Sequence, residues 1–463
     1  MTGLLDPFSR PVALFDSHGE GGVSSGETPD ESRPDRGDFS PVLITEVELT
    51  EPLPELPTEE QARSYGGAWV LVRHHSEPLA VVRLGFGPST TGAALRETIA
   101  AELGTLLRTR LGADAEQIPE RLALGGSPTE AGAPFLEERE HALRSGPPIS
   151  IVLCTRGRAE SLARTLDSLA TQQYPRFEVV VVDNTSGDPA VETLTRRSGR
   201  DIPVQYVIEP RTGLSRARNR GTASASGDIV AFIDDDEVAD QYWLAELSRG
   251  YLVGQDVAAV SGAILPAALD TQAQDWFEQY GGHSKARGFS QEVFPGSQSP
   301  IYPLPPFGAG GNMSFRKASL AEIGGFDIAL GAGTPARGGE DTAAFSRAML
   351  AGYKVVYRPS ALVWHHHYVD LDGIRRQLAA YGSGLTAYYT ALLWSDPRLA
   401  FKLIPLIPRA LQDMFGRESV RTSSIRDDFP PSLLKAHRRG MLRGPWAYVR
   451  GRRDATATES VAA

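Results

Sequence analysis

Three groups of residues in this sequence have types and spacings that could do chemistry, and the first is acidic. Four consecutive carboxylic acids, Asp234 to Glu237, follow the apolar run Ile229–Ile233. Carboxylates packed this closely repel one another, and a bound divalent cation would relieve that repulsion. A helix N-terminus, where carboxylates are also stabilised, offers a second interpretation. The position of the group at the end of an apolar run favours the cation site.

The other two groups are a second acidic pair and a run of histidines. Glu340 and Asp341 follow the glycine-containing loop 331–339 and precede a helical pattern. Such a pair could cap the helix, or it could supply a general base beside a moving loop. His365 and the two histidines after it follow a strand-like segment, and histidine commonly binds metals or transfers protons. The segment 307–317 is rich in glycine, which permits close approach of a ligand, although a tight turn explains it equally well.

The elements that must position these groups follow from the periodicity of the apolar residues. Across residues 149–369, strand-like apolar runs alternate with helical patterns. This alternation indicates an α/β domain with a mostly parallel sheet flanked by helices. Ligands bind beyond the carboxyl ends of the strands in such domains. The polar residues that fall at these ends are Thr155, Arg156, Asp183, Asn184, Glu209, Asp234, Asp235 and Asp236.

The segments on either side of this domain differ from it in composition. Residues 1–41 contain few large apolar side chains and are expected to be disordered. Residues 42–148 predict a small α+β module and a connector, with a hairpin over 68–84 and a helix over 95–111. Residues 370–463 predict a C-terminal helical region with a basic tail. The chain is therefore divided into an N-terminal module, an α/β domain and a helical end.

Composition excludes several classes of protein. The chain has 463 residues and a net charge of −10, so general electrostatic attraction to nucleic acid is not expected. A single cysteine excludes a disulfide framework and a cysteine-based zinc site. We find neither an apolar run of about 18 residues, which a membrane-spanning helix needs, nor the pattern of a signal peptide. These features predict a cytoplasmic protein.

The average charge hides a gradient that bears on possible partners. Residues 1–148 carry a net charge of −12, whereas residues 401–463 carry +6. Within 400–453, apolar side chains interrupted by proline are followed by many lysines and arginines. A basic, apolar segment of this kind could lie on an anionic membrane surface, and packing against the rest of the protein is the alternative.

Six motifs follow one another between residues 149 and 367: Ser150–Arg158, Val179–Ser186, Gly213–Gly221, Gly227–Asp236, Gly310–Arg316 and Gly339–Asp341. Together they resemble the family 2 glycosyltransferases, which have the Rossmann-like GT-A fold. The resemblance covers a little under half of the chain and leaves out the N-terminal module.

The resemblance implies a metal-dependent enzyme that moves a sugar from a nucleotide donor, usually a UDP-sugar, to a hydroxyl group of a glycan or glycolipid acceptor. It further implies inversion at the anomeric carbon, with Asp341 as the general base and Glu340 beside it. The expected cation is Mn²⁺ or Mg²⁺. Its implied ligands are Asp234, Asp236 and His365, with Asp235, His366 and His367 as alternatives.

The resemblance also assigns residues to the two substrates. Asp183 fits the position that binds the nucleobase. The other residues expected near the nucleotide donor are Thr155, Arg156, Asn184, Arg218, Asn219, Asp234 and Asp235. The residues expected to contact the transferred sugar or the acceptor are Gly310, Gly311, Asn312 and Trp364.

Two other functions compete with this interpretation. A sugar-phosphate nucleotidyltransferase would share the α/β architecture, but the sequence lacks a basic, glycine-rich phosphate loop after the first strand. A non-catalytic sugar-binding module is disfavoured by the presence of Asp234, Asp236 and Asp341. We therefore expect an enzyme of cell-envelope polysaccharide synthesis, in the cytoplasm or on the inner face of the plasma membrane. The particular sugar, acceptor, linkage and oligomeric state are left open.

Overall fold

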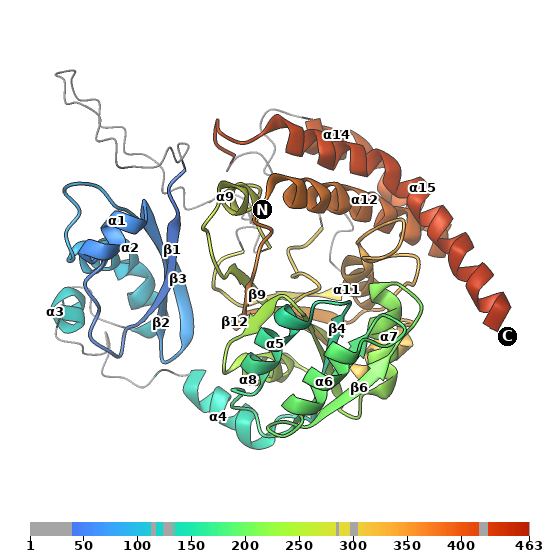
Figure 1. Cartoon of the computed structure of the whole chain (residues 1–463), viewed down its shortest axis with the longest axis horizontal. Coiled ribbons are helices and arrows are strands. Elements are labelled where there is room, and N and C mark those ends of the chain that lie inside the picture. Colours follow the sequence, from blue (N-terminus) through green and yellow to red (C-terminus); the bar gives the residue numbers. More distant parts are fainter. Residues whose placement is uncertain are drawn as a thin grey trace, which may run out of the picture.

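The computed structural model describes residues 39–112, 117–123, 133, 135–283, 287–296, 304–415 and 425–462. Its largest part is a nine-stranded sheet with helices on both faces (Figure 1). The strands of this sheet are β4 (Ile149–Thr155), β5 (Phe177–Asp183), β6 (Val204–Ile208), β7 (Ile229–Asp234), β8 (Glu237–Ala239), β9 (Val257–Pro266), β10 (Glu292–Phe294), β11 (Met313–Arg316) and β12 (Lys354–His365).

The helices that accompany the sheet come from the segments between the strands. They are α5 (Ala159–Leu169), α6 (Pro189–Ser198), α7 (Leu214–Ser224), α8 (Trp243–Gly250), α9 (Gln272–Gln279), α10 (Lys317–Glu322) and α11 (Glu340–Leu350), with the short 3-10 helix η1 (Tyr251–Val253) after α8.

The order of the strands in the sheet is β10-β12-β9-β11-β7-β4-β5-β6, and β8 pairs with the end of β12. Strands β7, β4, β5 and β6 are parallel neighbours, as are β12 and β9. The prediction of an α/β domain with a mostly parallel sheet is therefore confirmed. Antiparallel β11 joins the two parallel groups, and antiparallel β8 and β10 flank β12; the periodicity had not predicted these three antiparallel strands.

The two faces of the sheet are covered because successive side chains along a strand point in opposite directions. From β4, Ile151 and Leu153 pack with α5, α6 and α8 on one face. Val152 and Cys154 pack with α7, α10 and α11 on the other face. A strand that is buried on both faces carries an unbroken apolar run, which explains the runs of consecutive apolar residues that begin at residue 149.

The N-terminal module forms its own three-stranded sheet. Its elements are β1 (Val42–Glu48), α1 (Glu59–Ser64), β2 (Gly67–His74), β3 (Glu77–Gly85), α2 (Ala94–Leu111), α3 (Ile118–Ala123) and α4 (Phe135–Ser145). The antiparallel β2–β3 hairpin and helix α2 confirm the two predicted elements. Strand β1, which pairs parallel with β2, had not been predicted.

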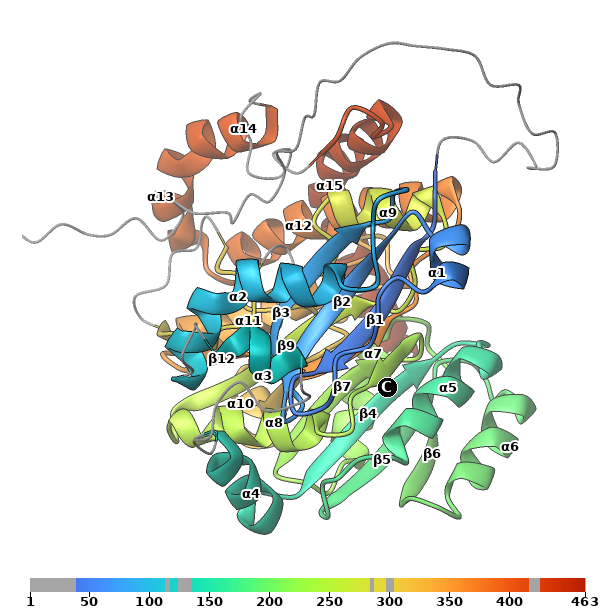
Figure 2. The same ribbon diagram turned by 90° about the vertical axis from the view of Figure 1, so that its left-hand side faces the viewer.

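The module packs directly on the α/β domain. Helix α2 covers one face of the small sheet. On the opposite face, Trp69 and Leu71 of β2 belong to one apolar cluster with Leu265 of β9 and Leu362 of β12. Figure 2 shows the module from the side that faces away from the large sheet. The small sheet is thus sandwiched between its own helix and the edge region of the large sheet.

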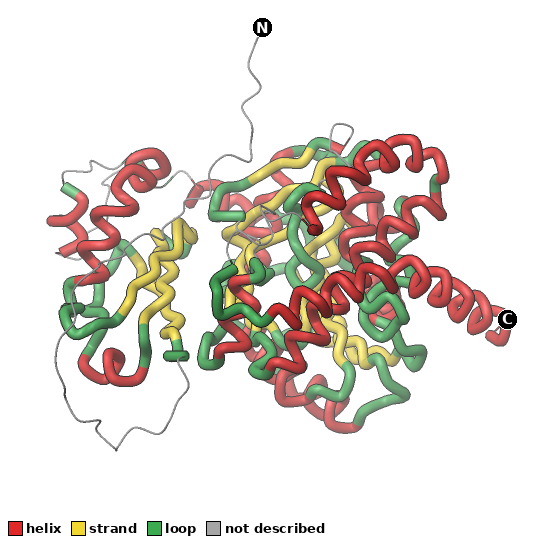
Figure 3. The backbone as a smooth tube through the Cα atoms, turned by 90° about the horizontal axis from the view of Figure 1, so that it is seen from above, coloured by secondary structure: helices red, strands yellow, loops and turns green. Residues whose placement is uncertain are grey.

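The C-terminal region is helical, as predicted. Its elements are α12 (Leu371–Ser395), η3 (Pro397–Leu399), α13 (Ala400–Leu403), η4 (Ile404–Leu406), α14 (Ile407–Phe415) and α15 (Pro431–Ala462). Helices α12 and α15 lie side by side (Figures 1 and 3). Glycine allows this close packing, because a Cβ atom on Gly382 would lie 2.1 Å from the carbonyl oxygen of His437.

Two further expectations concern the ends of the chain and the membrane. The predicted disorder of residues 1–41 falls almost entirely outside the described residues. Within the described part of the chain, no helix combines the length and the apolar character that crossing a bilayer requires.

A buried ionic network ties α4, α8 and β12 together. The carboxylate of Glu246 accepts hydrogen bonds from Arg139 at 2.7 Å, from Arg249 at 2.5 Å, from Arg358 at 3.2 Å and from Ser360 at 2.7 Å. Burial alone would raise the pKa of Glu246, but the charges of Arg249, Arg358 and Arg139 lower it to about 2. The network therefore needs the ionised carboxylate.

We expect the substitution Glu246→Gln to reduce the free energy of unfolding by about 3 kcal/mol, because it leaves buried guanidinium groups without their counter-charge. Since the folded pKa lies below the unfolded value of 4.5, the stabilisation from Glu246 is present above pH 4.5 and is lost as the pH falls toward 2. Denaturant unfolding at several pH values measures both effects. Glu192→Gln, which breaks an exposed pair with Arg196, is the control and should cost less than about 0.5 kcal/mol. Equal losses in the two variants would contradict the assignment.

Candidate active site

The predicted acidic group, Asp234 to Glu237, lies at the carboxyl end of β7, where the chain turns sharply into β8. We call these four residues the acidic turn. Strand β8 runs antiparallel to the last residues of β12, with Glu237 opposite His365 in the register. The backbone N–H of His366 also donates to the carbonyl oxygen of Asp236 at 3.1 Å. This pairing brings the histidine run beside the acidic turn, although more than a hundred residues separate them in the sequence.

The buried guanidinium of Arg218, on α7, joins the two acidic groups. It lies 3.1 Å from Asp234 Oδ1 and 2.9 Å from Glu340 Oε1, and it donates to the carbonyl oxygen of Gly310 at 3.0 Å. The Arg218 side chain is only 2 % exposed. Arg218, expected beside the donor, therefore acts in this structure as the counter-charge that holds the Glu340–Asp341 pair against the end of β7.

A second arginine, Arg158, binds the acidic turn through Asp235 and Asp236. No role was predicted for Arg158 from the sequence. Its guanidinium forms ion pairs with both Asp235 and Asp236, the latter at 2.7 Å. Its position at the end of the first motif was the only signal in the sequence. Arg156, two residues earlier, is exposed at the same strand end. A half-exposed arginine beside two carboxylates is well placed to meet a phosphate.

The three aspartates of the turn face different surroundings. Asp235 is fully buried and accepts a hydrogen bond from the Thr155 hydroxyl at 2.6 Å. Burial raises the pKa of Asp235 to about 6, against the lowering effects of Arg158 and Thr155. The side chains of Asp234 and Asp236 remain 36 % and 22 % exposed. A ligand approaching from solvent therefore meets Asp234 and Asp236 first, and Thr155 supports the turn from below.

His365 faces the turn with one ring nitrogen. Its Nε2 lies 3.6 Å from Asp236 Oδ1, and its Nδ1 lies 2.7 Å from Nδ1 of His367. Burial lowers the pKa of His365 to about 4, despite the opposing charge of Asp236, so the imidazole is neutral at pH 7. His366 points to solvent, whereas His367 is buried.

These groups fit a hard or borderline divalent cation. Asp234 and Asp236 keep partly exposed carboxylates at the end of β7, and the neutral His365 at the end of β12 places Nε2 3.6 Å from Asp236 Oδ1. Oxygen donors suit Mg²⁺ and Mn²⁺, and an added imidazole favours a transition metal such as Mn²⁺. The donor chemistry of these side chains suits such an ion, and the assignment of Asp234, Asp236 and His365 as its ligands stays a prediction.

Two residues expected at the nucleotide shape the neighbouring loops. Asp183 is fully buried and accepts hydrogen bonds from Thr185, from the backbone N–H of Asp188 and from the hydroxyl of Tyr206. Asn184 bonds to the backbone of residues 209–213. In this structure their polar atoms hold the loops at the strand ends, and direct contact of these side chains with the nucleotide stays a prediction.

Asn219 and Asn312 have similar supporting roles. Asn219 bonds to both the N–H and the carbonyl oxygen of Phe326. Asn312 is fully buried; it accepts from the indole of Trp243 at 2.8 Å and donates to two strand carbonyl groups. The prediction that Asn312 contacts a substrate is wrong, because every polar atom of its side chain is engaged inside the sheet.

The remaining residues predicted to contact substrate also pack against protein. Trp364 belongs to the apolar cluster between the large sheet and the N-terminal module. A Cβ atom on Gly311 would lie 2.2 Å from the Glu237 carboxylate, and one on Gly310 would lie 3.1 Å from Arg218. The glycines thus make room for the buried side chains under the site. Trp364 is only partly buried, and substrate contact by Trp364 and Gly311 stays a prediction. Gly310 lies against Arg218 and Asp341 at the site itself.

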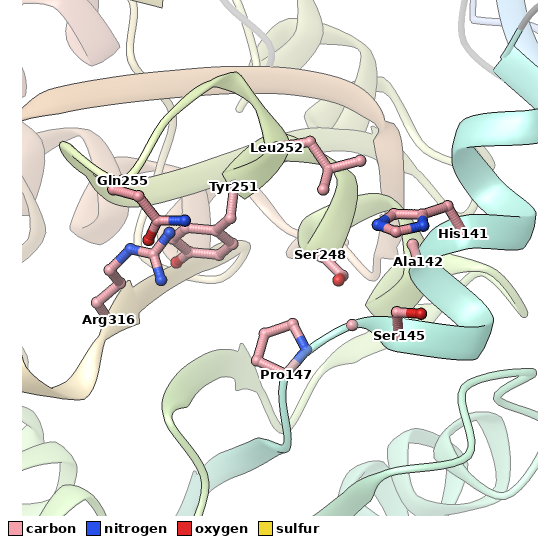
Figure 4. Close-up of a pocket in the computed structure, with 10 residues that line it drawn as sticks. His141, Ala142, Ser145, Pro147, Ser248, Tyr251, Leu252, Gln255 and Arg316 are labelled. Carbon is pink, nitrogen blue, oxygen red and sulfur yellow. The ribbon is translucent and has the colours of Figure 1, made fainter.

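A separate cavity of ≈ 240 Å³ lies at the opposite end of β4 (Figure 4). His141, Ser248, Tyr251 and Arg316 are among the side chains that line it. It adjoins Pro147, just before β4 begins, whereas Thr155 ends the strand about 20 Å away. This cavity is therefore distinct from the acidic site.

Comparison with known families decides the class of the domain. Residues 150–324 match the model of the family described as Glycosyl transferase family 2. The chain carries a family 2 glycosyltransferase domain. The match begins in β4 and includes the acidic turn and Arg218, but it ends before the Glu340–Asp341 pair.

Curated relatives agree with this class. The chain is 27 % identical over 187 residues to a glucosyl-dolichyl phosphate glucuronosyltransferase of Haloferax volcanii, which covers 40 % of this chain and 57 % of the relative. It is 31 % identical over 225 residues to the succinoglycan biosynthesis protein ExoM of Rhizobium meliloti; the matched residues are 47 % of this chain and 66 % of ExoM. The chain thus spans less than two thirds of the length of these relatives.

One solved structure shares part of its fold with this chain at low sequence identity. The mannosyltransferase of Pyrobaculum calidifontis, determined in complex with GDP-Man and Mn²⁺, is 19 % identical, with a TM-score of 0.41. The comparison covers 71 % of this chain and 83 % of that structure.

We expect Arg218→Met to lower the free energy of unfolding by about 3 kcal/mol, because Glu340 and Asp234 would lose their buried counter-charge. Arg220→Met, on the exposed side of the same helix, is the matched control and should change stability by less than about 0.5 kcal/mol. Denaturant unfolding of the two variants measures the difference. A loss confined to the control, or no loss in either variant, would show that Arg218 does not hold the site together.

Proposed function

We propose that the chain is a metal-dependent, inverting glycosyltransferase that uses a nucleotide-sugar donor, a UDP-sugar by family resemblance. The observation that carries the proposal is the placement of two acidic groups on either side of one buried arginine. Asp234 at the end of β7 and Glu340 at the start of α11 both contact Arg218. One acidic group could bind a cation that neutralises the diphosphate leaving group, and the other could take the proton of the attacking hydroxyl. These are the two requirements of sugar transfer from a nucleoside diphosphate.

The donor side of the proposed site is the acidic turn. Asp234, Asp236 and His365 would hold the divalent cation, which supplies charge neutralisation for the diphosphate leaving group. Arg158, already paired with Asp236, adds a second positive group that can bind a phosphate oxygen in a planar, two-point manner. Thr155 fixes Asp235 beneath the turn, so that the outer two carboxylates keep their positions.

The acceptor side of the proposed site is the acidic pair, and its two members differ. Glu340 is buried against Arg218; burial and the charge of Asp341 raise its pKa to about 7, against the lowering effect of Arg218. Asp341 remains partly exposed, and its Oδ1 accepts from the backbone N–H of Thr342 at 2.6 Å. Asp341 is therefore the member of the pair that an acceptor hydroxyl can reach.

The proposed reaction is a single displacement. The acceptor oxygen attacks the anomeric carbon as the bond from that carbon to the diphosphate oxygen breaks. Asp341 takes the hydroxyl proton, and the nucleoside diphosphate leaves with the bonding electron pair. A single displacement inverts the anomeric carbon, and it needs a base but no covalent nucleophile.

We expect Asp341→Asn to reduce turnover by about 10²-fold or more, because an amide cannot accept the proton. Donor binding should persist, since Asp341 does not form the donor side. Release of nucleoside diphosphate from a panel of nucleotide sugars measures turnover, and titration with the donor measures its Kd. Asp256→Asn, which removes an exposed pair with Lys354 at the other end of the sheet, is the control.

Each outcome of this experiment decides between functions. Full turnover in Asp341→Asn would contradict the assignment of the base. Release of pyrophosphate from a sugar phosphate and a nucleoside triphosphate would indicate a nucleotidyltransferase instead. Sugar binding without turnover across the whole panel would indicate a non-catalytic module.

We further propose a hydroxyl group of a glycan or of a lipid-linked glycan as the acceptor. The relatives support this class, since their names include a dolichyl phosphate substrate and the polysaccharide succinoglycan. An acceptor of this kind would place the enzyme at the inner face of the plasma membrane, in the synthesis of a cell-envelope polysaccharide.

The proposed membrane contact is the segment of α13, η4 and α14. Phe401, Ile404 and Ile407 are 83 %, 60 % and 50 % exposed, although large apolar side chains are normally covered. Lys402 and Arg409 accompany them. Apolar side chains that enter the lipid and basic side chains that meet acidic headgroups are the two requirements of an interfacial helix.

We expect the protein to sediment with vesicles that contain anionic lipid and to bind neutral vesicles more weakly. The double substitution Phe401→Ser and Ile404→Ser should weaken vesicle binding by about tenfold or more, because each side chain contributes about 1.5–3 kcal/mol when fully buried. Leu350→Ser, an exposed apolar residue at the end of α11, is the control. Binding that does not depend on anionic lipid or on these side chains would refute the contact.

A further inference from the structure

Two hydrogen bonds connect His365, which lies beside the acidic turn, to helix α9. His365 Nε2 lies 3.6 Å from Asp236 Oδ1, and His365 Nδ1 lies 2.7 Å from His367 Nδ1. His367 Nε2 then lies 2.9 Å from Glu278 Oε1, near the end of α9. Neither Glu278 nor His367 has a part in the reaction proposed above. The chain connects the proposed metal site to a helix outside the central sheet.

The direction of these hydrogen bonds follows from what a cation requires of His365. A His365 ring that binds a cation through Nε2 must carry its proton on Nδ1, and it then donates to Nδ1 of His367. A His367 ring that accepts at Nδ1 carries its own proton on Nε2 and donates it to Glu278 Oε1. In this arrangement the Nε2 lone pair of His365 faces Asp236 Oδ1, and two acceptor atoms facing each other favour a cation between them.

Packing holds each ring of the chain in place. His367 is 4 % exposed, and the ring of Phe277 packs against it edge-on at 4.7 Å. His283 packs against His365 with ring centroids 4.4 Å apart. Helix α9 is fixed in turn by a capping box between Thr271 and Gln274 at its start. The orientation of the His365 ring is thus set by its neighbours before any ligand binds.

We propose that Glu278 and His367 are positioning residues that select the tautomer of His365, so that its Nε2 presents a lone pair to the divalent cation held at Asp236. This inference rests on the proposed function, because it assumes a cation at the acidic turn. It adds two residues that act through His365 and do not touch a substrate. Partners of this kind typically change metal affinity by 10–100-fold when removed.

A metal ion held by the histidines themselves is the competing interpretation. His283, His365 and His367 each offer one atom, and these atoms lie within 4.8 Å of one another. Two nitrogen ligands of a tetrahedral ion, each about 2.05 Å from it, would lie about 3.3 Å apart. The separation of 2.7 Å between the two Nδ1 atoms is instead that of a hydrogen bond.

The test measures Mn²⁺ binding to the full chain by electron paramagnetic resonance, without turnover. We expect His367→Phe to weaken Mn²⁺ binding by at least tenfold, because His365 loses the acceptor for its Nδ1 proton. His367→Gln supplies one acceptor and one donor and should recover part of the affinity. His141→Ala, which removes an exposed histidine at the opposite end of β4, is the control and should bind Mn²⁺ as the parent protein does.

A second readout reports the tautomer directly. The ¹⁵N chemical shifts of the His365 ring in the metal-free protein should show the proton on Nδ1, and Glu278→Leu should convert this signal to a mixture of tautomers. A purely structural role for Glu278 and His367 would leave both the tautomer and the Mn²⁺ affinity unchanged, and that result would overturn the proposal.

Two further outcomes separate this inference from the proposed function. If Asp236→Asn leaves Mn²⁺ binding intact, the cation site of the proposed function is wrong and this inference falls with it. If Asp236→Asn abolishes binding but His367→Phe does not weaken it, only the positioning role is wrong. A second bound ion that is lost in His283→Ala and kept in Asp236→Asn would assign the histidine cluster to a metal and overturn the hydrogen-bond chain.

Discussion

The site depends on the contact of one buried arginine with two acidic groups. The carboxylates at the end of β7 and at the start of α11 would repel each other if no positive charge lay between them. Arg218 neutralises that repulsion from inside the protein, at 3.1 Å from Asp234 and 2.9 Å from Glu340. Its planar guanidinium can hold both carboxylates and a backbone carbonyl at once, which the single ammonium group of a lysine cannot match. The outer aspartates remain available to ligands because Arg218 lies beneath them.

The pairing of β8 with β12 is the second requirement. It is a short antiparallel contact, yet it places His365 beside Asp236, and His367, two residues later, reaches Glu278 of α9. The rest of the domain supports this edge. The N-terminal module covers β9 and β12 through Trp69 and Leu71, and α12 packs with α9 and α15 on the side of the histidines. The added modules therefore stabilise the strands that carry the site.

The sequence predicted the elements well where a local period defined them. The hairpin of β2 and β3, helix α2, strands β4 to β7 and helix α12 each follow from apolar spacing. The sequence also placed Asp234 at the end of a strand, since the apolar run stops there. It did not predict β1, the long central strand β9 or the antiparallel strands β8, β10 and β11. The partners of these strands lie in segments that are distant in the chain.

The sequence alone determined which kinds of side chain the site contains, because motif order and strand ends are local properties. These are paired carboxylates, a histidine run and the glycines beside them. Which side chains face the site was decided only by the tertiary structure. Asn312 is buried inside the sheet and Trp364 packs toward the N-terminal module, whereas the ion pairs of Arg158 and the hydrogen bond between His367 and Glu278 join residues that are distant in the sequence. The physical reason is that a hydrogen-bond partner or an ion pair is fixed by distance in space, and the strand register that sets this distance is a property of the whole fold.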